Sequence, residues 1–89
     1  MIEHARGKIT RGGDMLADGV DVWIEKVQHG ELYGWHGGLA LPPGHSIGVG
    51  GPYRLELDDG RSGEILVTNI RFSGSAQTEA TFEGSGPLD

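Results

Sequence analysis

The chain has 89 residues, of which 17 are glycine and none is cysteine, and 13 acidic against 7 basic residues give a formal net charge of −6. This length suits one domain with a small core, so we expect a single domain over residues 1–89. The absence of cysteine excludes a disulfide framework and a thiolate metal site. The acidic balance, without a basic stripe, argues against nucleic acid as a partner.

Charge is distributed unevenly along the sequence. Residues 1–13 are mainly basic and residues 14–36 mainly acidic, so the N-terminal end can dock on the acidic middle of the same copy or another. No segment is apolar enough to span a bilayer, and the N-terminus lacks the apolar core of a signal peptide. We therefore expect a soluble, cytoplasmic protein without a membrane partner.

The first half of the chain contains three expected strands. Residues 7–10 can form a short first strand, preceded by a frayed tail over residues 1–6. Residues 20–27 predict a second strand, with valine and isoleucine on one face and Trp23 on the solvent side. Trp23 is then covered either by its own chain or by a partner.

The third expected strand covers residues 31–41 and contains several glycines. Tyr33, Trp35, Leu39 and Leu41 fall in one phase. Glycine within such a pattern predicts sharp coiling, or close approach of another backbone. Prolines then end the strand, and residues 45–51 form a loop with room for a brief edge strand.

A hairpin over residues 53–72 is the clearest local signal. Apolar and charged residues alternate from Tyr53 to Asp58, and Asp59-Gly60 is a typical hairpin turn. The return strand begins at Glu64 or Ile65. The apolar phase then slips, which predicts a bulge near Thr68-Asn69.

The last expected strand covers residues 78–83 with Ala80 and Phe82 inward, and residues 84–89 form a tail. Glycines spread between short apolar segments indicate turns, and no window has the apolar spacing of an amphipathic helix. Strands recurring every 8–12 residues predict an all-β domain. We expect a small antiparallel five- to six-stranded barrel, with a small two-sheet sandwich as the alternative.

The aromatic residues and Arg54 are the candidate partner-binding residues. Tryptophan and tyrosine are enriched in binding sites, although they can equally form the core of a small barrel. The sequence favours an interaction or assembly module that self-associates or docks on a protein partner. The residues expected to bind the partner are Trp23, Tyr33, Trp35 and Arg54.

A small-ligand site at the barrel mouth is the alternative function. It would hold a sugar, nucleotide or metal through Trp35, His36, His45 and the glycine-rich loop 44–52. That loop leads into a strand and has no lysine, so it does not match a phosphate-binding loop. The histidine and carboxylate spacings match no metal motif. We expect no metal, cofactor or catalytic residue, and hence no enzyme.

Overall fold

The computed structural model describes residues 2–29, 32–45, 47–72 and 77–89, with the backbone alone at residues 29, 32 and 33. None of these residues lies in a helix long and apolar enough to cross a membrane. The chain forms six strands: β1 (Ile2–Arg11), β2 (Asp14–His29), β3 (Leu32–Leu41), β4 (Gly50–Leu57), β5 (Ser62–Phe72) and β6 (Thr78–Ser85).

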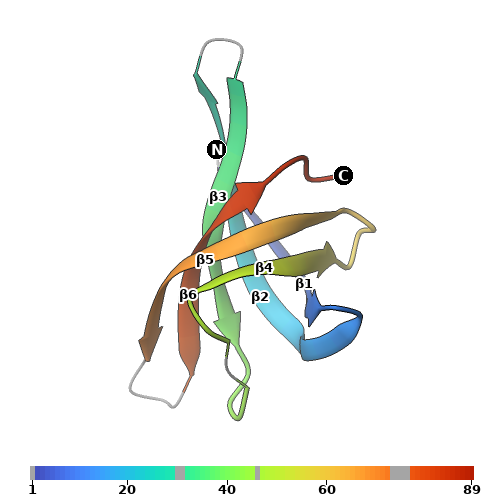
Figure 1. Ribbon diagram of the computed structural model, residues 1–89, viewed down its shortest axis with the longest axis vertical. Coiled ribbons are helices and arrows are strands. Elements are labelled where there is room, and N and C mark those ends of the chain that lie inside the picture. Colours follow the sequence, from blue (N-terminus) through green and yellow to red (C-terminus); the bar gives the residue numbers. More distant parts are fainter. Residues whose placement is uncertain (1, 30–31, 46, 73–76) are drawn as a thin grey trace.

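The strands close into a barrel in the order β1-β2-β3-β6-β5-β4, and every neighbouring pair is antiparallel (Figure 1). The expected antiparallel barrel is therefore confirmed, and the sandwich alternative is not adopted. Closure pairs the first strand with the fourth. A sheet that closes on itself leaves no free edge along its paired length.

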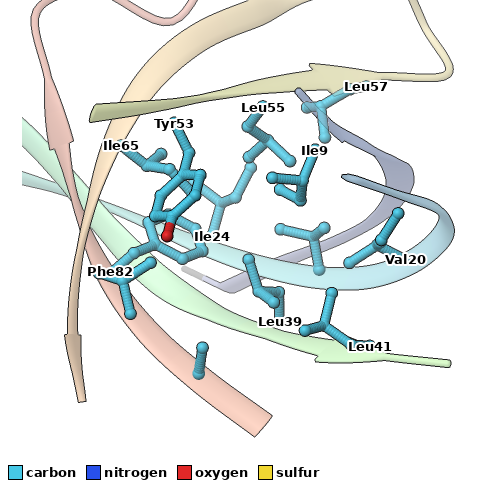
Figure 2. Close-up of a cluster of buried hydrophobic side chains, with 14 of the residues drawn as sticks. Ile9, Val20, Ile24, Leu39, Leu41, Tyr53, Leu55, Leu57, Ile65 and Phe82 are labelled. Atoms are coloured by element: carbon cyan, nitrogen blue, oxygen red, sulfur yellow. The ribbon is translucent and has the colours of Figure 1, made fainter. Parts of the chain in front are cut away.

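Alternate positions of each strand fill the interior of the barrel (Figure 2). The inward faces expected for the second strand and for the hairpin are confirmed, because their valine, isoleucine, leucine and tyrosine side chains are buried. The largest fully buried side chains come from all six strands: Phe82, Ile9, Ile24, Leu41, Leu55, Ile65, Val20 and Val67.

The hairpin forms at the predicted turn. Gly60 has a φ of 97°, which glycine adopts without a steric penalty, and the Arg61 N–H donates to Asp59 Oδ1 at 3.0 Å. The return strand begins at Ser62, earlier than predicted. The predicted bulge is confirmed by a register shift between Val67 and Asn69.

The chain ends are more ordered than the sequence pattern indicates. Residues 2–6 are not a frayed tail, because they pair with residues 21–25 of β2. Residues 84–85 belong to β6, and the Asp89 N–H donates to the Ser62 carbonyl at 2.9 Å. The long second strand supplies the template for the first, which a local pattern does not reveal. No strand forms over residues 47–49.

Glycine allows the backbones of neighbouring strands to approach closely at Gly37 and at Gly7. A Cβ atom at Gly37 would overlap the carbonyl oxygen of Trp23 on β2, and one at Gly7 would overlap that of Glu56 on β4. The close approach predicted for the third strand is thus confirmed. Gly34, on the same strand, has no atom of the described residues within 4 Å of the corresponding position.

An ion-pair cluster, the Arg61 clasp, holds the β4–β5 turn against β1. Arg61 Nη1 donates to Glu3 Oε1 at 3.0 Å, and its Nε donates to Asp59 Oδ2 at 2.9 Å. These hydrogen bonds lower the pKa of the Glu3 and Asp59 carboxyls below their ordinary values and raise the pKa of Arg61. The clasp therefore depends on ionised carboxylates.

We predict that Gly37→Ala destabilises the barrel, because the new methyl group meets backbone rather than a movable side chain. The expected cost is about 2 kcal/mol, or a fall in the thermal unfolding midpoint of roughly 10 °C. Gly34→Ala is the matched control on the same strand and should change stability by less than about 0.5 kcal/mol. Equal midpoints for the two variants would contradict the close approach.

We also predict that the contribution of the Arg61 clasp depends on pH. Because the folded-state pKa values of Glu3 and Asp59 are lowered, their contribution is fully present above about pH 5 and is lost as the pH falls through the folded values. Thermal unfolding of the natural chain and of Arg61→Met should differ by a few degrees at neutral pH and converge in acid. A difference that persists unchanged at pH 3 would show that the clasp acts through packing alone.

Candidate functional site

Two rows of outward-facing residues cross the barrel wall over β1, β2, β3, β6 and β5. Within each row, successive residues are cross-strand neighbours in the observed registers. The first row consists of Arg6, Asp21, Ala40, Glu79 and Arg71. The second row consists of His4, Trp23, Gly38, Thr81 and Asn69. Both rows line a groove of about 560 Å³, which we call the Trp23 groove.

Small residues of β3 form the floor of the Trp23 groove. A Cβ atom at Gly38 would overlap Nε1 of Trp23, so the indole lies over this glycine. The indole also meets the imidazole of His36 edge-on, with ring centroids 6.3 Å apart. Trp23 is half-buried on the outer wall, as its phase in the sequence predicts, and its own chain covers it in part.

Each flank of the groove carries an arginine paired with a carboxylate. Arg6 Nε lies 3.2 Å from Asp21 Oδ1, and Arg71 Nη2 lies 2.9 Å from Glu79 Oε2. All four side chains are exposed to solvent by 41–80%. Exposed ion pairs of this kind contribute little to folding stability. Because the side chains are exposed, a ligand can reach their donors and acceptors.

The other expected partner-binding residues lie elsewhere. Trp35 belongs to the core: it lies over Gly84, and its Nε1 donates to the Gly86 carbonyl at 2.8 Å. Arg54 lies on the outer face of β4, outside the groove, and its Nη2 donates to Ser62 Oγ at 2.6 Å. The side chain of Tyr33 is outside the described part of the structure.

The structure does not bring together the three residues of the expected mouth site. Trp35 and His36 are successive in a strand, so their side chains point to opposite faces. His36 lies on the outer wall, with Nε2 3.9 Å from Glu25 Oε2. His45 lies in the β3–β4 loop, with Nδ1 3.2 Å from the Leu16 carbonyl. The described residues contain no cluster of three potential metal-ligating side chains.

The glycine-rich loop is tied to the barrel rather than arranged around a ligand. The Gly48 N–H donates to the Tyr53 hydroxyl at 3.0 Å, and the hydroxyl lies 3.1 Å from the Gly48 carbonyl. Ile47 also packs against the core. Within its described residues, this loop acts as a cover at one end of the barrel.

Sequence reasoning did not identify most of the groove residues as a site. Its charged and polar members are far apart in the chain and become neighbours only through strand register: His4, Arg6, Asp21, Asn69, Arg71 and Glu79. Opposite charges at outward positions are the available signal. These charges cannot be matched into cross-strand pairs until the order of the strands is known.

A second hollow, of about 510 Å³, lies between the β1–β2 hairpin and the β4–β5 turn. Its lining includes Lys8, Glu56, Asp58 and Arg61 but no aromatic residue. Arg61 is already engaged in the clasp. The Trp23 groove is the better candidate because it combines an aromatic platform with donors and acceptors.

Comparisons with protein-family models, with curated proteins and with solved structures found no match to this chain. The site is therefore assigned from its own geometry and chemistry alone.

Proposed function

We propose that the protein is an interaction module that binds its partner non-covalently in the Trp23 groove. One observation carries the proposal: a hollow in the outer wall is lined by a half-buried tryptophan and two arginine–carboxylate pairs. Aromatic side chains and arginines are the residues that most often dominate binding energy. Their gathering at one hollow is the main support for a recognition role.

The chemistry of the groove suits recognition rather than bond making. Its arginines and carboxylates are already paired, so they offer planar donors and acceptors in set positions. Five paired strands hold these side chains, and a site on strands is positioned more precisely than one on loops.

Self-association is a second candidate, supported by the β2–β3 arm. Pairing of β1 with β2 ends at Glu25, and pairing of β6 with β3 ends at His36. In the described registers, residues 26–29 and 32–35 pair with each other, and this arm extends beyond the barrel past Trp35, whose side chain lies in the core (Figure 1). Exposed strand edges are templates for pairing with another chain.

We predict that ligands of this protein perturb the Trp23 groove. Amide and indole N–H resonances can be followed by NMR while neutral oligosaccharides and short peptides are added. Shifts should concentrate at the Trp23 indole, Gly38 and Thr81, and Trp23→Ala should weaken binding by about tenfold or more. Arg54→Met, on the outer wall beyond the groove, is the control. Shifts located elsewhere, or none with any probe, would count against the groove.

For the self-association candidate, light scattering over a wide concentration range should show a dimer at high concentration. Hydrogen exchange should then slow in the arm, at residues 26–29 and 32–35, while the strand pairs of β1 with β4 stay unchanged. A monomer at every concentration would remove this candidate and leave the groove proposal intact.

A further inference from the structure

We infer that the occupant of the Trp23 groove is a neutral saccharide, a short oligosaccharide without ionised groups. This inference rests on the proposed function and names the class of ligand at that site. Three properties of the groove support it: the balance of its charges, the kind of hydrogen bonds it offers, and the nature of its floor.

The charges of the groove select against ionic ligands. Arg6 and Arg71 are offset by Asp21 and Glu79, so these four side chains have no net charge. A phosphate or polycarboxylate would face the two carboxylates and approach a chain of net charge −6. A cationic group would face the two guanidinium groups. A neutral ligand meets neither repulsion.

The hydrogen-bonding groups suit hydroxyls. A hydroxyl both donates and accepts, whereas a guanidinium only donates and a carboxylate only accepts. On each flank of the groove both kinds lie side by side, 2.9 Å apart for Arg71 and Glu79 and 3.2 Å apart for Arg6 and Asp21. Two adjacent hydroxyls can therefore accept from the arginine and donate to the carboxylate. Asn69 and Thr81 add an amide and a further hydroxyl.

The floor of the groove suits a flat ligand with an apolar face. Trp23 lies over Gly38, and Ala40 is the neighbouring floor residue on the same strand. The C–H face of a sugar ring can pack on an indole, which is apolar on its face and polar at its N–H. A volume of about 560 Å³ is within the range of small-molecule sites.

A peptide occupant is less well supported by the same geometry. At the centre of the groove, β2, β3 and β6 are each paired on both sides. A free edge for a peptide backbone exists only at the flanks, where the described pairings of β1 and β5 with β4 do not reach His4 or Arg71. An amphipathic helix needs an apolar groove, but charged side chains form both flanks here. Peptide binding is therefore the alternative outcome of the test.

The test is an NMR titration of the whole chain with matched probes. Neutral gluco-, manno- and galacto-oligosaccharides are compared with uronic-acid oligomers, amino-sugar oligomers and short peptides. We expect at least one neutral oligosaccharide to shift the Trp23 indole N–H and to bind at least about tenfold more tightly than its charged counterparts. Equal binding of charged and neutral sugars would overturn the inference.

The remaining outcomes separate the inference from the proposed function. If peptides shift the groove resonances and no saccharide does, the saccharide class is wrong and the interaction module stands. If no probe shifts them, both are rejected.

Variants of the groove give a second readout. Trp23→Ala and Arg71→Met should each weaken saccharide binding by about tenfold, and Trp23→Phe should retain part of it because an apolar ring remains. Gly38→Ala should also weaken binding, because its methyl group displaces the indole, which is a side chain at the surface. Arg54→Met is the matched control, and thermal unfolding verifies that each variant folds. Unchanged affinity in Trp23→Ala and Arg71→Met together would overturn the inference.

Discussion

Closure of the barrel depends on the pairing of β1 with β4. This contact runs over four residue pairs, from Gly7 with Leu57 to Thr10 with Arg54, and it joins strands from opposite halves of the chain. Gly7 makes it possible, since any side chain at this position would overlap the β4 backbone. Without this pairing, both strands would present free edges. The Arg61 clasp adds a side-chain link beside the same junction.

The two adjacent glycines of β3 serve the two faces of the wall. Gly37 lets the backbone of β2 approach, so the sheet can coil tightly around a small core. Gly38 leaves the outer wall low at its centre, and the indole of Trp23 lies across it. The adjacent glycines therefore contribute both to the coiling of the sheet and to the floor of the Trp23 groove.

For the proposed function, the placement of the charged groove residues matters more than their contribution to folding stability. The pairs of Arg6 with Asp21 and Arg71 with Glu79 are exposed and contribute little to stability. In the proposed function, their role is to set donors beside acceptors on both flanks of one tryptophan. The buried Trp35 instead has a structural role, because it packs against Phe82 in the core and donates a hydrogen bond to the C-terminal tail.

Local signals determined the parts of this structure that repeat within a few residues. The alternation of Tyr53, Leu55 and Leu57, the Asp59-Gly60 turn and the bulge after Val67 follow from side-chain period and turn chemistry. The outward position of Trp23 follows in the same way. Each of these properties can be predicted because it depends only on residues close together in the chain. Together they predict an all-β barrel.

Only the tertiary structure decided the strand order, the full length of β1 and the groove. Residues 2–6 have no strand pattern of their own and are ordered by pairing with β2. Trp35 lies in the core rather than at a mouth site, and its indole N–H donates a hydrogen bond to the C-terminal tail. Arg6, Asp21, Glu79 and Arg71 become one site because register places them in one row. Register joins residues distant in the chain, so the local pattern of a single sequence does not specify it.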